Sequence, residues 1–146
     1  MVLYVIPFLV RIVLDTNILV AAFRSKRGAS NALLSKVGTS IFEIALSVPL
    51  MFEYEDVLAR PEFAFDPMQV DAVLDYLAAV GVEQQIHFLW RPFLKDPKDD
   101  MVLELALNAK CSHVVTFNIK DFKGSQQFGI EAIAPKDFLA LLGGST

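Results

Sequence analysis

Five acidic side chains stand where they could do chemistry together, close to predicted strand ends or helix starts. They are Asp15, Glu53, Asp99, Asp100 and Asp121. Carboxylates that converge repel one another and raise one another's pKa, and no lysine or arginine is obviously placed to pair with all of them. A divalent cation removes this repulsion, and hard oxygen ligands of this kind suit Mg²⁺ or Mn²⁺. Such an ion can activate a water and stabilise the leaving oxygen of a phosphoryl displacement.

Each of these acids also has a purely structural interpretation. Asp15 and Asp121 could cap the turns that follow their strands, and Glu53 could be an ordinary solvated helix residue. Asp99 and Asp100 could stabilise the first turn of a helix through its dipole. One acid alone would be weak evidence for a site, whereas the joint pattern favours a metal centre for phosphoryl chemistry.

The elements that must position these acids are strands that alternate with helices. Short apolar runs predict buried strands over residues 12–14, 42–46, 114–115 and 130–133, and an edge strand over 82–88. Apolar spacing and breaking residues predict helices over 17–23, 29–37, 49–60, 67–79, 96–110 and 136–142. This alternation predicts βαβ units in a three-layer α/β/α fold with a central, mainly parallel sheet. Ligands of such sheets bind beyond the carboxyl ends of the strands, so the sheet would bring the acids to one edge.

Length and composition indicate one domain spanning residues 1–146. The hydrophobic content of 54% favours a sheet buried on both faces, or an interface that hides apolar surface. The formal net charge of −4 gives no broad basic footprint for nucleic acid. An enzyme that grips phosphate through metal ions would not need one.

The first ten residues are almost wholly apolar. They are too few to span a bilayer, they lack the features of a secretory signal, and Arg11 interrupts any extension. We therefore expect no membrane span, and an ordered apolar extension over residues 1–10 at a dimer contact. The single cysteine, Cys111, excludes an internal disulfide and fits a reducing cytoplasm.

Other residues with reactive or aromatic side chains favour structural roles. His87 and His113 are isolated, and no metal-ligand spacing links them. Cys111 has no evident base partner and is expected to be a buried thiol, and Trp90 is expected in the core. The basic loop over residues 24–28 is either a solvated connection or a contact for substrate phosphate.

Four motifs follow one another along the chain at the positions of the acids. They are I-V-L-D-T-N at residues 12–17, S-x-P-L-x-x-E-Y-E-x-V-L at 47–58, D-P-K-D-D-x-V-L-E-L-A at 96–106 and V-V-T-x-N-x-x-D-F at 114–122. Together they resemble the motifs of PIN-domain proteins, in particular the single-domain bacterial and archaeal members that act as toxins of type II toxin–antitoxin pairs. The tail I-x-A-I-A-P-K-D-F-L at 130–139 is similar to the last strand and helix of that family.

The resemblance implies a metal-dependent ribonuclease that cuts single-stranded RNA and leaves a 5′-phosphate. Carried over by position, Asp15 is the first acid of the site, Glu53 the second and Asp121 the fourth. The third falls on Asp99 or Asp100. Spacing to the next motif favours Asp100, whereas helix geometry leaves the choice open because Asp99 aligns with the apolar stripe of its helix. All five acids are therefore candidate ligands of Mg²⁺ or Mn²⁺.

The resemblance also assigns roles to polar neighbours of the acids. Thr16, Asn17 and Thr116 would hold the carboxylates or contact the phosphate. Asn118 stands where many members have an aspartate, so it would orient a water or a ligand rather than bind metal directly. A cognate antitoxin that blocks the site is implied as a partner, and the excess apolar surface favours a homodimer.

Three other classes of protein compete with this interpretation. Haloacid-dehalogenase-like phosphatases need D-x-D after the first strand, but here Asp15 is followed by Asn17. A phospho-receiver domain would use Lys136 near its phosphoryl group, but it needs adjacent acids after the first strand. A PIN fold that binds RNA or a partner without cutting is the third. Metal-dependent turnover separates the enzyme from the binder, and phosphorylation of an aspartate would favour the receiver.

Overall fold

The computed structural model describes residues 9–86 and 93–143. His87 and Trp90 lie outside these ranges, as does most of the apolar extension predicted over residues 1–10. Within the described ranges, no helix is long and apolar enough to cross a membrane.

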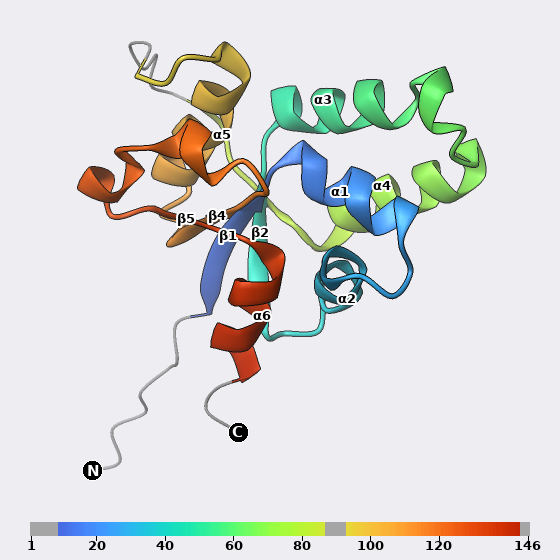
Figure 1. Ribbon diagram of the computed structural model, residues 1–146, viewed down its shortest axis with the longest axis horizontal. Helices are drawn as coiled ribbons and strands as arrows, with labels where there is room; N and C mark the ends of the chain where they lie inside the picture. The colour runs from blue at the N-terminus through green and yellow to red at the C-terminus, as the bar shows by residue number, and fades with distance from the viewer. Residues whose placement is uncertain (1–8, 87–92, 144–146) are drawn as a thin grey trace.

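A five-stranded sheet forms the centre of the protein (Figure 1). Its strands lie in the order β3-β2-β1-β4-β5, and every pairing is parallel. The strands are β1 (Val10–Leu14), β2 (Phe42–Leu46), β3 (Val82–Glu83), β4 (His113–Val115) and β5 (Glu131–Ile133). The mainly parallel sheet predicted from the sequence is therefore confirmed.

Strand β1 occupies the middle of the sheet because its residues are apolar on both faces. Ile12, Val13 and Leu14 are each at most 1% exposed. β1 pairs with β2 on one side and with β4 on the other, where Leu14 lies opposite Val115. The strand predicted over residues 12–14 is thus the central one, and it begins two residues earlier, at Val10. The carboxyl ends of β1 and β4 consequently lie side by side.

Six helices connect the strands, and the six predicted helices are all present with ends shifted by a few residues. They are α1 (Thr16–Arg24), α2 (Ala29–Ser35), α3 (Val48–Leu58), α4 (Pro67–Val80), α5 (Pro97–Asn108) and α6 (Pro135–Gly143). Short 3-10 helices add η1 (Pro61–Phe63), η2 (Ile119–Phe122) and η3 (Ser125–Phe128). Within the described ranges, four helices begin at side-chain caps: Asp15 before α1, Ser47 before α3, Asp66 before α4 and Asp96 before α5. Each cap satisfies a backbone N–H that the helix itself leaves without an acceptor.

Helices cover both faces of the sheet (Figure 1). On one face α1 packs against α2, and α6 also packs against α2. On the other face α5 contacts β1, β2 and β4. The chain moves outward from β1 to β3 and then returns across the sheet to β4, so right-handed crossovers place the returning helix on the opposite face. This arrangement confirms the predicted three-layer α/β/α fold.

The edge strand is shorter than the sequence predicts. β3 pairs with β2 through Val82 and Glu83, and the N–H of Gln84 still donates to the carbonyl of Leu46 at 2.8 Å. Residues 84–86 are not part of a strand, and residues 87–88 lie outside the described ranges. An edge strand has one neighbour to pair with, so its length is set by where that neighbour ends.

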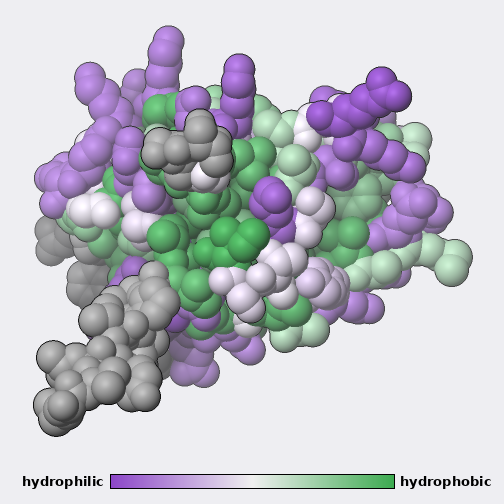
Figure 2. Space-filling model, turned by 90° about the horizontal axis from the view of Figure 1, so that it is seen from below, coloured by the Kyte–Doolittle hydropathy of each residue, from purple (hydrophilic) through white to green (hydrophobic). Residues whose placement is uncertain are grey.

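Apolar side chains reach the surface at the end of the molecule where β1 and β2 begin. Leu9, Val10 and Ile41 are between 37% and 43% exposed. Figure 2 views the molecule from this end and shows apolar surface in its middle, bordered by hydrophilic side chains. This end is opposite the carboxyl ends of the strands, so a contact made here would leave the acids uncovered.

Candidate active site

Asp15 lies directly after β1 and caps helix α1. It is 9% exposed. One carboxylate oxygen, Oδ1, accepts the N–H of Thr16 at 2.9 Å, and Oδ2 accepts the hydroxyl of Thr116 at 2.7 Å. Burial raises the pKa of Asp15, these two hydrogen bonds lower it, and the carboxylates of Asp121 and Glu53 raise it further. The cap is therefore also a buried carboxylate that faces other acids.

Thr116 connects the end of β4 to the end of β1 and is fully buried. Besides donating to Asp15, its oxygen accepts the side-chain amide of Asn17 at 3.3 Å and the backbone N–H of Asn118 at 2.9 Å. The amide of Asn17 also lies 3.4 Å from Oδ2 of Asp15, and its Oδ1 accepts the N–H of Phe117. Thr116 and Asn17 thus hold the carboxylate of Asp15 in one orientation.

Glu53 reaches the site from α3, which is fixed across the end of β1. The buried hydroxyl of Tyr54 donates to the carbonyl of Leu14, the last residue of β1. The Glu53 side chain is mostly buried, and its Oε1 lies 3.6 Å from the ammonium of Lys98. Lys98 therefore neutralises part of the charge of one acid, Glu53.

Asp99 is the acid whose titration is changed most clearly. Its pKa is raised to about 7, mainly by burial and then by the carboxylates of Asp15, Asp96 and Asp121, in that order, with Asp100 adding the smallest contribution. Two of these groups, Asp15 and Asp121, come from other elements of the fold. Asp99 therefore faces the acids at the ends of β1 and β4.

Asp100 serves a different segment of the chain. Its Oδ1 accepts the backbone N–H groups of Phe93 and Leu94, at 3.2 and 2.8 Å. It lines neither of the cavities in which the other acids lie. The geometry does not support the sequence-based preference for Asp100 over Asp99 as the third acid. The reason is that Asp100 is engaged by the backbone before α5, whereas Asp99 faces Asp15.

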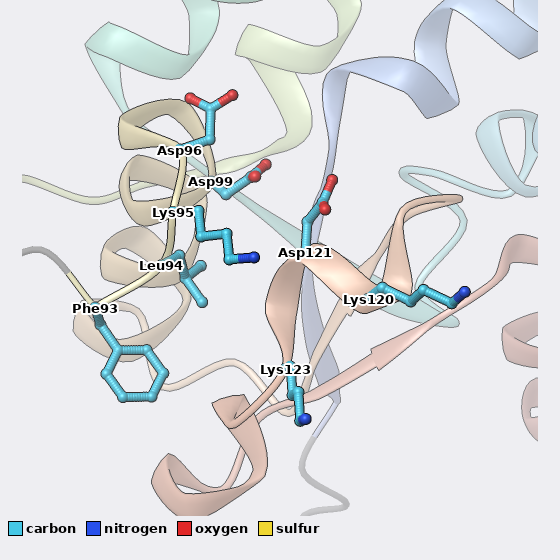
Figure 3. A pocket seen from close by; sticks show the side chains of 8 residues that line it. All are labelled: Phe93, Leu94, Lys95, Asp96, Asp99, Lys120, Asp121 and Lys123. Atoms are coloured by element: carbon cyan, nitrogen blue, oxygen red, sulfur yellow. The ribbon is translucent and has the colours of Figure 1, made fainter.

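Asp121, in η2, lines a cavity of about 450 Å³ together with Asp96 and Asp99 (Figure 3). In Figure 3 the side chains of Asp99, from α5, and Asp121, from η2, extend into the same space. Three lysines line the same cavity: Lys95, Lys120 and Lys123. In Figure 3 the ammonium group of Lys95 points toward the acids, whereas those of Lys120 and Lys123 point away from them. The cavity thus combines acids with a cationic rim.

A second cavity of about 310 Å³ adjoins the first, because Asp96 and Asp99 line both. Its lining includes Asp15 and Glu53 with the predicted neighbours Thr16, Asn17 and Asn118. Arg24, Arg60 and Phe63 complete its far side. The two cavities together hold four of the five predicted acids, all except Asp100.

The sequence profile of the PIN domain matches residues 11–120. The chain belongs to the PIN-domain family. The matched range contains Asp15, Glu53 and Asp99, and it ends one residue before Asp121. No curated protein matches the sequence. PIN domains are generally nucleases and typically use divalent metal ions, so the family and the chemistry of the acids agree.

The donor set of this PIN domain fits a hard divalent cation. Carboxylate oxygens are the ligands that Mg²⁺ and Mn²⁺ prefer. The pKa values of Asp15 and Asp99 are raised first by burial and then by neighbouring carboxylates, and a bound cation would favour the charged form of both. Among the described residues, no three acidic, histidine or cysteine side chains already lie close enough to enclose an ion. Closure of the carboxylates onto an ion therefore needs side-chain rotation.

Several residues that line the PIN-domain cavities were not singled out from the sequence. Asp96 and Lys98 lie inside the D-P-K-D-D motif, which was the available indication. Arg60 and Phe63 follow α3, where the sequence indicates only that a helix ends at a proline. Arg24 is the one charged residue of the basic loop that lines the second cavity.

The remaining candidates lie away from the acids and have structural surroundings. Cys111 is a buried free thiol, as predicted, and burial raises its pKa to about 12. His113 packs edge-on against Phe138, and its Nε2 lies 3.6 Å from Glu131. Burial lowers the pKa of His113. Neither residue lines a cavity that contains the acids.

Proposed function

We propose that this PIN domain is a Mg²⁺- or Mn²⁺-dependent endoribonuclease that hydrolyses phosphodiester bonds of single-stranded RNA. One observation carries the proposal. Asp15, Asp99 and Asp121 come from three different elements, and two adjoining cavities that share Asp99 bring them together. Burial first, and then neighbouring carboxylates, raise the pKa of Asp15 and Asp99. Such a concentration of negative charge is costly unless a cation joins it.

Asp15, Asp99 and Asp121 would hold the ion, and Glu53 would contribute directly or through a water. A bound divalent cation lowers the pKa of a water and stabilises the leaving oxygen of a phosphodiester. Asp99 takes the place that sequence spacing gave to Asp100, because Asp100 is bonded to the backbone of residues 93–94.

The groups around these acids prepare the site for that chemistry. The N–H of Thr16 and the hydroxyl of Thr116 fix both oxygens of Asp15. The Asp15 side chain therefore loses little rotational freedom when a ligand binds. Lys98 restrains Glu53. The exposed Asn118 would orient a water or a phosphate oxygen, since its backbone N–H is already bonded to Thr116.

The substrate is proposed to be a single strand because of where the positive charge lies. Lys95, Lys120 and Lys123 line the first cavity beside Asp99 and Asp121. Phosphates on either side of the cleaved bond could contact these ammonium groups. A local group of lysines can attract phosphates although the protein has a net charge of −4 and no broad basic surface.

We also propose that the protein is the toxin of a toxin–antitoxin pair and acts in the cytoplasm as a homodimer. The motif resemblance supports the toxin role, the free Cys111 fits a reducing compartment, and the apolar end at Leu9 and Val10 could form the dimer contact. An antitoxin would cover the acidic cavities. Growth arrest on expression in a bacterial host, lost in Asp15→Asn, would test the toxin role. Sedimentation velocity would test the dimer.

The deciding experiment is cleavage of a mixed single-stranded RNA pool with Mg²⁺ or Mn²⁺. The parent protein is compared with Asp15→Asn, which keeps the size of the side chain and removes its charge. Asp71→Asn, an exposed acid on α4, is the matched control. We expect metal-dependent cutting by the parent and the control, and none by Asp15→Asn.

Two other outcomes would contradict the proposal. Cutting that survives in Asp15→Asn would mean that a contaminant or another site is responsible. No cutting by the parent, over a broad RNA set and with both metals, would favour the alternative of a PIN fold that binds RNA or a partner without catalysis.

A further inference from the structure

Arg24 and Phe63 form a platform on the far side of the second cavity. The guanidinium carbon of Arg24 lies 4.9 Å from the centre of the Phe63 ring. Both residues line the cavity of about 310 Å³ that also contains Asp15 and Glu53. A cation–aromatic pair therefore lines the same space as the acids.

The surrounding residues hold this platform in place. The Phe63 ring is stacked on Phe65 at 5.3 Å with an interplanar angle of 10°, and Phe65 contacts Phe23 at 5.3 Å. Phe23 precedes Arg24 at the end of α1, so the rings join η1 to α1. The N–H of Ala64 closes the η1 turn by donating to the carbonyl of Pro61 at 3.1 Å. The platform is thus built from two elements that pack against each other.

The charge on the platform is available to a ligand. Arg24 is exposed, and within the described part of the chain it forms no ion pair with a carboxylate. Arg60, from the same cavity, lies 3.9 Å from an exposed partner, Asp56, and such surface pairs contribute little. Two guanidinium groups therefore line a cavity whose opposite wall is acidic, without pairing with that wall.

We infer that the guanidinium of Arg24, held over the Phe63 ring, forms a base-stacking subsite for one nucleotide of a single-stranded RNA, with Arg60 contacting a neighbouring phosphate. Single-strand binders combine aromatic or guanidinium planes, on which bases stack, with cations that follow the backbone. The inference rests on the proposed ribonuclease function for the identity of the strand. It adds a contact that would decide which nucleotide lies beside the acids.

The test measures binding of a labelled single-stranded oligoribonucleotide by fluorescence anisotropy. The Asp15→Asn protein is the background, so that the RNA stays intact. Two substitutions remove stacking: Arg24→Lys keeps the charge but loses the plane, and Phe63→Leu keeps the apolar bulk but loses the ring. Their matched controls are Arg27→Lys, in the same basic loop, and Phe52→Leu, an exposed ring on α3.

We expect Arg24→Lys and Phe63→Leu each to raise the Kd about fivefold or more, because one stacked base contributes on that scale. The controls should stay within about twofold of the background protein. The dependence of Kd on salt should not change in Arg24→Lys, since the charge remains. An oligonucleotide with abasic sites throughout should bind equally to the background protein and to both variants.

A last variant separates stacking from loss of structure. Phe63→Tyr keeps an aromatic ring, so it should bind like the background protein even if Phe63→Leu loosens the η1 turn. Failure of Phe63→Tyr to bind, or equal binding by Phe63→Leu, Arg24→Lys and the background, would overturn the subsite. No RNA binding by the background protein would overturn it as well.

The outcomes also distinguish this inference from the proposed function. If RNA is cut by the parent protein but binding does not depend on Arg24 and Phe63, the ribonuclease stands and the subsite is wrong. If binding depends on both residues and on the bases, yet the parent cuts no RNA, the subsite stands and the catalytic proposal is wrong.

Discussion

Two adjacent acids at the start of α5 have different tasks in this PIN domain. Asp99 faces Asp15 and Asp121, whereas Asp100 accepts two backbone N–H groups from residues 93–94. The sequence could not separate them, because both lie in the first turn of a helix and both suit its dipole. Helix periodicity aligned Asp99 with the apolar stripe of the helix, whereas motif spacing favoured Asp100, and which of them is the third acid stays a prediction.

Substitution of the two acids should therefore have opposite effects. Asp99→Asn is expected to lower metal-dependent RNA cleavage about 100-fold or more, the scale on which groups of metal sites act. Its metal-free form should be at least as stable as the parent, because repulsion with Asp15 is relieved. Cleavage assays and urea unfolding without metal would measure the two effects.

Asp100→Ala should instead lower the free energy of unfolding by about 1–2 kcal/mol, because two backbone N–H groups lose their acceptor. Cleavage should remain within about tenfold of the parent protein. A larger loss of activity in Asp100→Ala than in Asp99→Asn would show that the third acid is Asp100 after all.

The raised pKa of Asp99 predicts how stability depends on pH when metal is absent. The folded protein keeps the proton of Asp99 up to a pKa of about 7, whereas the unfolded chain releases it near the ordinary aspartate pKa of 3.8. The folded state is therefore favoured at low pH, and this contribution is lost as pH rises from about 4 through 7. We expect metal-free protein to gain stability from Asp99 between pH 8 and pH 5.

The measurement compares chemical unfolding of the parent protein and Asp99→Asn across that pH range. The difference between their free energies of unfolding reports on Asp99, because His113 is present in both proteins. The lowered pKa of His113 changes stability with pH in the opposite sense. The difference should shrink when Mg²⁺ is added, because a cation favours the charged carboxylate. A pH-independent difference in metal-free protein would contradict the assignment.

At the scale of elements, the sequence was most informative where burial is complete. The central strand at Ile12–Leu14 is apolar on both faces. In a chain of this size, such a run indicates a strand that is covered on both sides. The edge strand β3 was predicted too long. It pairs with one neighbour, β2, and its sequence carries no pattern of apolar residues that marks where this pairing stops. The convergence of acids followed from the parallel topology, as expected from the carboxyl ends of the strands.

The link between β1 and β4 gives a prediction about Thr116. Thr116→Val keeps the shape of the side chain and removes the hydroxyl that donates to Asp15 at 2.7 Å. Since that bond lowers the pKa of the buried Asp15, we expect its pKa to rise further and the free energy of unfolding to fall by about 1–3 kcal/mol at neutral pH. NMR titration of the Asp15 carboxyl and urea unfolding would measure both effects. Unchanged values would mean that the N–H of Thr16 and the amide of Asn17 hold the carboxylate without the hydroxyl of Thr116.

At the scale of the whole molecule, the two joined cavities could not be predicted from the sequence. Their walls combine the ends of β1 and β4 with α3, α5 and η1, and the pairing of Lys98 with Glu53 joins residues far apart in the chain. Motifs placed the acids, since each motif is one continuous stretch that covers a single element or two consecutive ones. The cationic and aromatic walls come from segments such as Arg60 to Phe63, whose positions depend on how helices pack rather than on any local pattern.

The acids of the whole site together predict that a divalent cation stabilises the fold. A cation that binds the folded protein and not the unfolded chain adds about 2.7 kcal/mol at 100 times its Kd, which raises the Tm by about 5–10 °C for a chain of this size. Differential scanning fluorimetry with Mg²⁺ and Mn²⁺ would measure this shift. We expect Asp15→Asn and Asp99→Asn to lose most of it and Asp71→Asn to keep it. The two site variants should also start from a higher Tm without metal, because each removes one of the repelling charges. A shift retained in both of them would place the ion away from the carboxyl ends of β1 and β4.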